Sequence, residues 1–502
     1  MNLFAQIRQN IPSREKIFLQ DAAGGHITYG DMLSRTARIA NVLVQRGVKP
    51  GDRVAVQVEK TAENLLLYLA ALRAGAVYLP LNTAYTLAEL DYFIGDAEPA
   101  LVVCDPAKRE GVAEIAKTRG VGAVETLDAK GAGSLMDAAA TAPEEFSDIA
   151  RADDDLAAIL YTSGTTGRSK GAMLTHRNLA SNALTLKDYW RFTDTDVLLH
   201  ALPIYHTHGL FVASNTLMLA GGSMIFLPKF DADQVMSLLP KATSMMGVPT
   251  FYTRLLKHPG LTKAACAHMR LFTSGSAPLL AETHIEFQDK TGHAILERYG
   301  MTETNMNTSN PYDGDRIAGT VGFPLPGVVL RIADHESGRE LPQGEIGGIE
   351  VKGPNVFLGY WRMPEKTKAE FRADGFFITG DVGRIDARGY VHIVGRAKDL
   401  VITGGFNVYP VEVEAEIDAI PGVVESAVIG CPHPDFGEGV TAVVVCKPGA
   451  ELNEKAIIGL LEPRLAKFKL PKRVLFVDDL PRNTMGKVQK NVLREQNKGL
   501  YS

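Results

Sequence analysis

Apolar and polar positions alternate in blocks along the first part of the chain, and each block has the length of a strand or a helix. Arg53–Val58 and Val77–Leu79 have the pattern of buried strands, whereas Thr61–Ala74 is a longer apolar run that ends at Gly75, as helices commonly do. Strands joined by helices in this way run parallel within one sheet. Further apolar segments of strand length follow at 101–104, 197–202, 224–227 and 269–274. The pattern therefore predicts an α/β fold with more than one parallel sheet.

The pattern changes near Glu345, where short strands and glycine-rich turns replace the longer blocks. A domain boundary is expected at Gly395–Asp399. Beyond it, a separate pattern of helices and strands begins at Pro410. We therefore predict a large N-terminal domain of fused α/β subdomains over residues 1–395, a linker at 396–399 and a small α+β domain over residues 400–502.

Composition narrows the class of protein. With 502 residues the chain is too long for one core, since domains mostly run to about 100–200 residues. Its 45% hydrophobic and 22% charged residues are typical of globular proteins, which disfavours disorder and coiled coils. Fifty-three Lys and Arg against 58 Asp and Glu give a net charge of -5. No basic field therefore favours nucleic acid, and we expect small-molecule partners.

Cysteines and apolar runs bear on the compartment. The four cysteines are scattered without a C-x-x-C pair, which argues against a disulfide framework or structural zinc and fits the reducing cytoplasm. The N-terminus shows no signal-peptide pattern. Val197–Pro228 lacks charged residues and is long enough to suggest a membrane span, but Pro203 and the pair Gly221-Gly222 interrupt it. We expect buried strand, helix and strand there, and no membrane partner.

The stretch Tyr161–Gly171 has the composition of a phosphate-binding loop. It follows an apolar, strand-like run and contains three glycines, five Ser or Thr hydroxyls, and two cations, Arg168 and Lys170. Glycines let backbone N–H groups approach an anion, while the hydroxyls and cations add donors and charge. The loop matches neither the Walker A sequence nor the dinucleotide G-x-G-x-x-G. A flexible surface turn is the alternative that the loop alone leaves open.

Five motifs in order resemble those of the acyl-adenylate-forming, or AMP-binding, superfamily of acyl-CoA synthetases, peptide-synthetase adenylation domains and luciferases. They are Thr162–Gly167 with Lys170-Gly171, Tyr299–Glu303, Thr379–Asp381, Gly395–Asp399 and Pro481–Lys487. The resemblance spans nearly the whole chain. It implies ATP and CoA as co-substrates and Mg²⁺ as a cofactor. It also implies a mobile C-terminal lid. In this chemistry a carboxylate attacks the α-phosphorus of ATP, and the acyl-adenylate then reacts with a thiol.

The resemblance also implies roles for individual residues in nucleotide binding. Glu303, with Thr162, would hold Mg²⁺, and Thr302 would border the α-phosphate; a lone Glu is otherwise a solvated acid. Asp381 would bind the ribose with help from Arg396, although it could equally be a turn residue. The loop residues implied to cradle phosphates are Thr162, Ser163, Gly164, Thr165, Thr166, Gly167 and Lys170. The residues implied around the α-phosphate and adenine are Ser276, Ala277, Pro278, Glu297, Arg298, Tyr299, Gly300 and Met301.

Residues of the implied lid divide between the two half-reactions. Lys487 resembles the lysine that reaches the α-phosphate during adenylation, and a lysine acetyltransferase and deacetylase would regulate it by removing and restoring its charge. Lys398 occupies the implied hinge, which would swing Gly404 and Gly405 toward the pantetheine of CoA. Two adjacent glycines could also form a plain hairpin turn.

His206-Thr207-His208 could present two imidazoles on one face of a strand, which is the spacing of a metal site, but no third ligand lies nearby in sequence. The resemblance instead makes His206 an active-site gate beside the acyl carbonyl, with Thr207 lining the acyl pocket. Cys431-Pro432-His433 could suggest a nucleophile, but the thiol of CoA makes a structural cysteine the better interpretation.

The acid substrate depends on one arginine. A helix beginning near Pro249 would place Arg254 one turn in, and arginine is well suited to bind a carboxylate through two hydrogen bonds. A fixed cation there predicts a dicarboxylate. The whole sequence resembles the malonyl-CoA synthetases of the superfamily, which implies malonate and also methylmalonate, in a pocket narrowed by Thr207 and Met306 beside Ser274. An exposed helix arginine is the alternative for Arg254, and Arg298 is the competing carboxylate ligand.

Three other functions remain open from the sequence. An adenylation enzyme that loads a carrier protein would keep Lys487 and the loop, but no carrier domain is seen before Ser502. A luciferase-like oxygenase would emit light with a suitable substrate. A non-catalytic nucleotide sensor is disfavoured because Glu303, Asp381 and Lys487 are all present.

Overall fold

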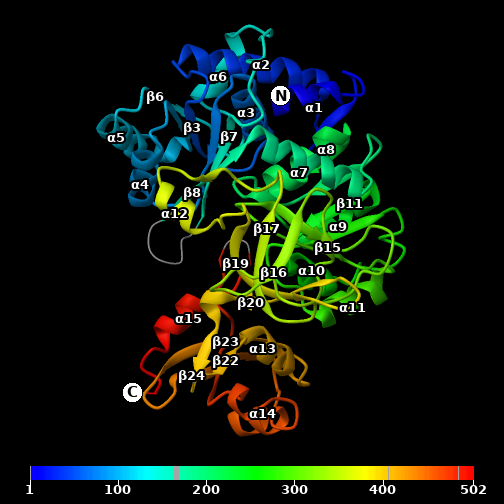
Figure 1. Cartoon of the computed structure of the whole chain (residues 1–502). Coiled ribbons are helices and arrows are strands. Elements are labelled where there is room, and N and C mark those ends of the chain that lie inside the picture. The colour runs from blue at the N-terminus through cyan, green and yellow to red at the C-terminus, as the bar shows by residue number, and fades with distance from the viewer. Residues whose placement is uncertain (1, 163–168, 405, 484–485, 502) are drawn as a thin grey trace. The chain divides into compact units, whose positions relative to one another are not determined.

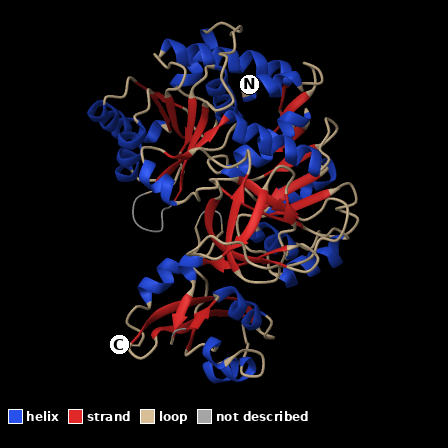
Figure 2. Ribbon diagram, in the orientation of Figure 1, coloured by secondary structure: helices blue, strands red, loops and turns tan. Residues whose placement is uncertain are grey.

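The computed structural model describes residues 2–162, 169–404, 406–483 and 486–501. Contacts divide the chain into two compact units (Figures 1 and 2). The first, called here the N-terminal unit, comprises Met1–Val329 and Lys352–Gly375, and the second, the C-terminal unit, comprises Leu330–Val351 and Phe376–Ser502.

The N-terminal unit contains a seven-stranded sheet in the order β18-β8-β7-β4-β3-β5-β6. β3 pairs in parallel with β4 and β5, and β5 with β6, as the alternation of strands and helices predicts. α4 and α5 cover this sheet by packing Phe93 and Val112 among residues such as Ala55 and Val102. The strands are β3 (Arg53–Gln57), β4 (Val77–Pro80), β5 (Leu101–Cys104), β6 (Ala123–Thr126), β7 (Leu156–Thr162), β8 (Lys170–Thr175) and β18 (Gly359–Tyr360).

A second sheet of this unit has nine strands in the order β15-β14-β13-β12-β11-β9-β10-β1-β2. The six strands from β13 to β1 in that order pair in parallel, and antiparallel strands complete both edges. The carboxyl ends of parallel strands meet at one edge of a sheet, where α/β proteins bind ligands. The strands are β1 (Ile17–Gln20), β2 (His26–Thr28), β9 (Val197–His200), β10 (Ser223–Phe226), β11 (Ser244–Gly247), β12 (Leu271–Ser274), β13 (Leu296–Met301), β14 (Asn305–Ser309) and β15 (Phe323–Pro324).

Helices α2 and α3 of this unit begin at threonine caps. Thr28 and Asp31 form a capping box at the start of α2, and Thr61 caps α3, whose residues Leu65–Leu72 are fully buried because the helix is apolar on all sides. The helices are α1 (Leu3–Gln9), α2 (Tyr29–Gln45), α3 (Ala62–Arg73), α4 (Leu87–Ala97), α5 (Arg109–Arg119), α6 (Ser134–Thr141), α7 (His176–Tyr189), α8 (Asn215–Ala220), α9 (Ala232–Leu238), α10 (Pro249–Leu256), α11 (Ala281–Thr291) and α12 (Pro364–Ala369).

The charge-free stretch Val197–Pro228 folds as β9, the π-helix η2 (His208–Ser214), α8 and β10. Most of its side chains are buried, which confirms the prediction of core strand, helix and strand. Across the described residues, every helix is too short or too polar to span a bilayer.

The C-terminal unit contains two further sheets. Its strands are β16 (Val329–Ala333), β17 (Gly347–Lys352), β19 (Phe377–Ile385) and β20 (Val391–Arg396) in one sheet, and β21 (Val401–Thr403), β22 (Phe406–Val408), β23 (Val423–His433), β24 (Gly437–Cys446) and β25 (Arg473–Phe476) in the other. Its helices are α13 (Pro410–Asp418), α14 (Glu454–Leu461) and α15 (Lys490–Gln496). Val413 and Ile417 of α13 and Ile457 and Leu461 of α14 pack against Val428 in a core of their own. The predicted α+β pattern of this region is confirmed.

The compact units differ from the boundary predicted at residue 395, because residues 330–351 and 376–395 group with the C-terminal residues. The physical reason is strand pairing. β19 and β20 form one antiparallel ladder that joins Asp381 to Arg396, so the chain cannot be divided between them without breaking the sheet. The predicted hinge at 396–399 coincides with the end of β20 and the 3₁₀ turn Ala397–Asp399, and its role stays a prediction.

Candidate active site

The predicted phosphate-binding loop follows β7 and precedes β8 in the sequence, and these two strands pair with each other. Thr162 ends β7 and Lys170 begins β8, and the two residues pair across the ladder. The predicted ligands Ser163, Gly164, Thr165, Thr166 and Gly167 lie outside the described residues. Both flanks of the loop contact α4: Tyr92 donates its hydroxyl to the Ser169 carbonyl at 2.7 Å, and the Tyr161 ring lies 4.7 Å from the Phe93 ring. Packing on one helix therefore fixes where the loop begins and ends.

Lys170 belongs to a cluster that also contains the predicted magnesium ligand. Its ammonium lies 3.4 Å from Glu370 and 4.3 Å from the centroid of the Tyr360 ring. The Tyr360 hydroxyl lies 2.7 Å from Glu370 Oε2 and 3.0 Å from Glu303 Oε1. Burial first, and these two carboxylates second, raise the pKa of the Tyr360 phenol, which therefore stays a proton donor. The cluster brings a candidate phosphate cation and a candidate metal carboxylate to one place.

Tyr360 and Glu370 are not among the residues that the sequence singles out. Their partners are far along the chain: Tyr360 is 57 residues from Glu303, and Glu370 is 200 residues from Lys170. The pairing of β18 with β8 brings them together, because Tyr360 lies opposite Ala172 in that ladder. A two-residue strand gives almost no periodic signal, so sequence patterns could not have found this contact.

Glu303 and Thr302 follow β13 at the carboxyl edge of the nine-stranded sheet. Glu303 is buried, and its backbone carbonyl accepts a hydrogen bond from Phe357 N–H at 2.7 Å. A buried carboxylate held by a tyrosine hydroxyl is an oxygen ligand that suits Mg²⁺. Thr302 is half-buried at the same turn.

The ends of β12 and β13 lie side by side, because Ser274 pairs with Glu297. This register places the predicted segment Ser276, Ala277 and Pro278 next to the predicted segment that contains Tyr299, Gly300 and Met301. Glu297 is buried, and burial raises the pKa of its carboxyl group; His284 lies 3.5 Å away. The two segments that the motifs assign to the nucleotide are therefore neighbours.

A metal site would require His206, Thr207 and His208 to form a strand, and they do not. His208 begins the π-helix η2, and Thr207 precedes it with helical backbone angles. Thr207 donates its hydroxyl to Asn305 Oδ1 at 2.9 Å, and His208 Nδ1 lies 3.1 Å from Ser276 Oγ. Burial, and then the Arg298 charge, lower the pKa of His206 to about 4, so its imidazole is neutral at physiological pH. π-Helices of this kind often occur at functional sites.

Arg298 is the most unusual cation of this region. It is 3% exposed, and among the described residues its Nε and Nη2 atoms have no hydrogen-bond partner. Burial lowers the pKa of its guanidinium to about 9. The group packs so closely on Gly275 that a Cβ there would lie 2.2 Å from Nη1. A buried guanidinium with open donors is costly unless an anion completes it.

Arg254, the predicted carboxylate ligand, lies in α10, which begins at Pro249 as predicted. Its side chain is exposed, however, so its assignment stays a prediction with a stronger competitor in Arg298. Met306 and Ser274 are both buried; the Ser274 hydroxyl has no hydrogen-bond partner among the described residues. Met306 packs against Gly300, where a Cβ would lie 2.5 Å from its terminal methyl group.

The C-terminal unit brings together its own predicted residues. Asp381 is buried and forms an ion pair with Arg396, whose Nε atom lies 2.9 Å from Asp381 Oδ1. Burial, and then the Arg396 charge, lower the pKa of Lys487 to about 8, while Asp381 and Asp399 oppose this. Lys487 is held in a tight turn by its own backbone: its N–H donates to Asn483 Oδ1 and its carbonyl accepts from Asn483 N–H, both at 2.9 Å.

Two further predicted residues of this unit lie at turns. Lys398 is exposed in the 3₁₀ turn Ala397–Asp399. Gly404 follows β21 with a positive φ of 58°, and its N–H donates to the Phe436 carbonyl at 2.9 Å. Gly405 lies outside the described residues. The structure thus places Lys398 and Gly404 in turns, and the roles of these residues and of Gly405 stay predictions.

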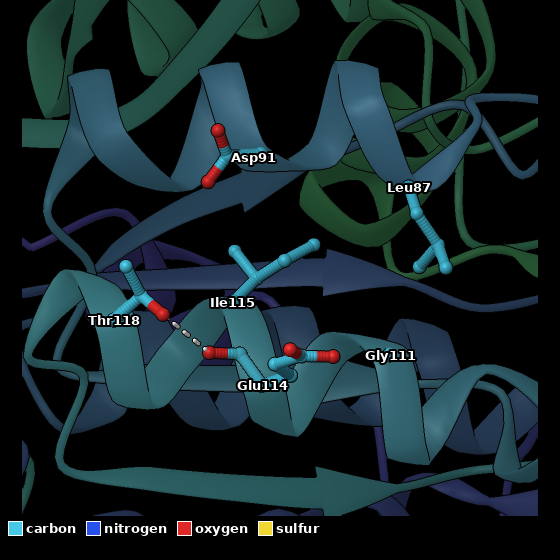
Figure 3. A pocket seen from close by; sticks show the side chains of 6 residues that line it. All are labelled: Leu87, Asp91, Gly111, Glu114, Ile115 and Thr118. Atoms are coloured by element: carbon cyan, nitrogen blue, oxygen red, sulfur yellow. Dashed lines mark hydrogen bonds between the residues drawn. The ribbon is translucent and has the colours of Figure 1, made fainter.

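A surface cavity of about 310 Å³ lies between α4 and α5 (Figure 3). Leu87 and Ile115 provide apolar walls, while Asp91 and Glu114 carry charge at its rim. The carboxylate of Asp91 is already bound by Arg119, through two hydrogen bonds of 2.8 and 2.6 Å. None of the residues that line the cavity is a predicted site residue.

Comparisons with known proteins agree with these motifs. Residues 7–361 match the family described as AMP-binding enzyme, and residues 412–487 match the AMP-binding enzyme C-terminal domain. The crystal structure of ATP-bound MatB from Rhodopseudomonas palustris is 69% identical, with a TM-score of 0.98 over 100% of this chain and 99% of that one. Feruloyl-CoA synthase of Amycolatopsis sp is 38% identical over 94% of each chain. The mitochondrial malonate–CoA ligase of Mus musculus is 36% identical over 94% of this chain and 87% of its own. The chain therefore belongs to the AMP-binding enzyme family.

Proposed function

We propose that this chain is an ATP-dependent acid–thiol ligase that converts malonate, ATP and CoA to malonyl-CoA, AMP and pyrophosphate through a malonyl-adenylate. Methylmalonate, which adds one methyl group, is the expected second substrate. The single observation that carries the choice of acid is the buried guanidinium of Arg298 with its open donors. A dicarboxylate supplies the anion that this group lacks, whereas a monocarboxylate uses its one carboxylate in the reaction itself.

Curated relatives at 34–38% identity do not by themselves select the acid. Relatives that are 38% and 36% identical are named for an aromatic acid and for malonate, and a malonate–CoA ligase of Arabidopsis thaliana is 34% identical. Relatives at this level of identity are therefore named for chemically different acids. Thr207, Ser274 and Met306 are all buried, and as the proposed lining of the acid pocket they would make it narrow and partly polar. This favours a short acid over an aromatic one.

In the first half-reaction we propose that Arg298 binds the distal carboxylate of malonate while the other carboxylate attacks the α-phosphorus of ATP. Pyrophosphate then leaves, and negative charge accumulates at phosphorus, where Lys487 would stabilise it. Lys170 would exchange Glu370 for the phosphates of ATP, and Asp381 would bind the ribose beside Arg396. His206, neutral because burial lowers its pKa, would border the acyl carbonyl without adding charge.

Mg²⁺ fits the cluster around Glu303. The donor there is a buried carboxylate oxygen positioned by the Tyr360 hydroxyl, and Thr162 would add a hydroxyl ligand. When bound, the ion would neutralise charge on the leaving phosphates. Glu303→Gln should lower the affinity of the site for Mg²⁺. Adenylation should then need a higher Mg²⁺ concentration and be slower. The check is a titration of the initial rate against Mg²⁺ at fixed ATP; an unchanged titration curve would argue against Glu303 as the ligand.

In the second half-reaction the thiolate of CoA attacks the malonyl carbonyl and AMP leaves. We propose that Lys398 is the hinge of the domain movement between the halves and that Gly404 and Gly405 then border CoA. Lys398→Pro should preserve adenylation and abolish thioester formation, because proline fixes φ and limits rotation at that position. Lys398→Ala is the matched control, since an exposed side chain is removed without restricting the backbone. Equal turnover of the two variants would remove the hinge assignment.

The lowered pKa of Lys487 predicts a pH dependence. Adenylation needs the charged ammonium, and the pKa of Lys487 is about 8, so kcat/KM for adenylation should be level below that pH and fall as pH rises through about 8. Lys487→Arg should move the fall to higher pH, because a guanidinium stays charged there. The measurement is the pH profile of malonate-dependent pyrophosphate release for both proteins. Superimposable profiles would show that another group titrates.

Acetylation would remove the same charge, so we also propose Lys487 as the target of a lysine acetyltransferase and deacetylase pair. The scattered cysteines suit a cytoplasmic site for the reaction.

The function itself is tested by ATP-dependent CoA thioester formation across malonate, methylmalonate, succinate, acetate, propionate and ferulate. Malonate should give the highest kcat/KM, and the nucleotide product should be AMP. Transfer to a carrier protein in place of CoA would identify an adenylation enzyme of the carrier-loading class, light emission would identify an oxygenase, and no pyrophosphate with any acid would identify a sensor.

A further inference from the structure

Lys60 is a buried amine with no carboxylate partner among the described residues. It lies between β3 and the N-cap of α3, and it is 7% exposed. Its ammonium nitrogen lies 2.9 Å from His200 Nδ1 and 2.8 Å from the His200 carbonyl oxygen, and 4.2 Å from the centroid of the Phe226 ring. Among the described residues no carboxylate forms an ion pair with it. Burial lowers the pKa of Lys60 well below its usual range, and burying such a polar group is unfavourable for stability, so its presence calls for another cause.

His200 carries this contact onward. It ends β9, is 1% exposed, and has its Nε2 atom 2.9 Å from the Gly209 carbonyl oxygen. A carbonyl only accepts, so Nε2 must carry the proton and donate it. In the neutral imidazole Nδ1 is then an acceptor, and Lys60 is the donor that faces it. The hydrogen bonds therefore run in one direction, from Lys60 through His200 to Gly209.

Gly209 is the second residue of the π-helix η2 and follows directly after His206, Thr207 and His208. Its carbonyl also accepts the Ser214 hydroxyl at 2.9 Å, and a Cβ at Gly209 would lie 2.1 Å from the Pro203 carbonyl oxygen. The segment is thus enclosed between Pro203 on one side and His200 on the other. A shift of His200 would be transmitted to the backbone that carries the proposed gate residue and the pocket residue Thr207.

We propose that Lys60 and His200 are positioning residues that hold the Gly209 carbonyl, and through it His206 and Thr207, in the arrangement that binds the acid substrate. The inference rests on the proposed function, because it concerns the same pocket. Neither residue contacts the reacting atoms in this proposal. Their effect should therefore appear in the binding and orientation of the acid and spare the phosphates of ATP, because the predicted phosphate cation Lys170 lies in another sheet.

A purely structural role makes the opposite prediction for stability. If Lys60 only filled space, Lys60→Met would keep the volume and lose useful contacts, so stability and all kinetic constants would fall together. If Lys60 is a buried polar group retained for positioning, methionine should leave the melting temperature unchanged or raise it while activity falls. Lys60→Arg keeps donors toward His200 and should restore part of the activity.

The experiment compares Lys60→Met, Lys60→Arg and His200→Gln with the parent enzyme and with Lys108→Met. Lys108 is a matched control, because its ammonium also contacts three neutral acceptors, Gln57 Oε1 and the carbonyls of Thr83 and Tyr85, but not the segment from His206 to Ser214. We expect kcat/KM for the acid to fall about 10- to 100-fold in Lys60→Met and His200→Gln, as for other misplaced binding groups. The KM for ATP should not rise, the melting temperature should not fall, and Lys108→Met should match the parent.

A readout independent of turnover is hydrogen exchange of the Leu210 amide, which donates to the His206 carbonyl at 3.0 Å. It should be less protected in Lys60→Met than in Lys108→Met. Parent-like kinetics and exchange in Lys60→Met would overturn the proposal, as would equal losses for acid and ATP with a lower melting temperature. The acid used is whichever the parent activates best, so a parent that rejects malonate would refute the proposed substrate and leave the positioning test intact.

Discussion

Lys487→Ala should abolish most malonyl-adenylate formation while leaving thioester formation from supplied malonyl-adenylate close to that of the parent. The ammonium is needed only where charge accumulates at phosphorus, and removing one such stabilising group commonly costs about 100- to 1000-fold in rate. The thiolate attack on an adenylate that is already formed does not place new charge there. The two half-reactions should therefore separate in this one variant.

The structure makes this variant a fair test. The turn that carries Lys487 is closed by backbone groups and by Asn483, so alanine keeps both hydrogen bonds. Lys490→Ala is the matched control: this lysine lies three residues away in the same unit and forms an ion pair with Glu414 at 2.5 Å. Single-turnover measurement of each half-reaction gives the answer. Equal losses in both half-reactions of Lys487→Ala would show that the residue serves folding or general binding instead.

Arg298→Ala should destroy the preference for malonate over propionate. The distal carboxylate would then be desolvated without a partner, which costs about 2–5 kcal/mol in transition-state binding, or roughly 30- to several-thousand-fold in kcat/KM. Propionate never uses this contact, so its weak activity should hold or rise. The ratio of the two kcat/KM values is the measurement, because a folding defect would lower both acids together.

Arg254→Ala is the internal comparison for this prediction, because that arginine is exposed on α10. It should keep the preference for malonate. Arg298→Lys should recover part of it, since lysine keeps the charge but not the paired donors. If Arg254→Ala loses the preference and Arg298→Ala keeps it, the carboxylate ligand is Arg254, as the sequence suggested, and the burial of Arg298 has another cause.

The fold was predictable from the sequence wherever the signal is local. The strand β3, the helix α3 and the strand β4 follow from apolar block lengths and from the glycine after the helix, because burial imposes these patterns on neighbouring residues. The nucleotide segments were found through motifs, and the register of Ser274 with Glu297 then places two of them side by side.

What sequence reasoning could not supply depends on contacts between distant residues. Arg254 is exposed and Arg298 is buried, and the burial of Arg298 depends on its packing against Gly275, which is distant in the sequence. The two histidines of His206-Thr207-His208 alternate with a threonine, which suggested a strand. The structure has a π-helix there instead, and a π-helix leaves no sequence period that so short a segment could reveal. The Tyr360 and Lys60 contacts join segments that no local pattern relates.

The most direct test of the central claim is malonate-dependent exchange of labelled pyrophosphate into ATP, measured without CoA. A ligase that works through a malonyl-adenylate must catalyse this exchange, because adenylation is reversible while the adenylate stays bound. We predict exchange with malonate that exceeds exchange with acetate, propionate or ferulate, and that disappears in Lys487→Ala. Malonyl-CoA formation without any pyrophosphate exchange, or with ADP and phosphate as products, would contradict the account.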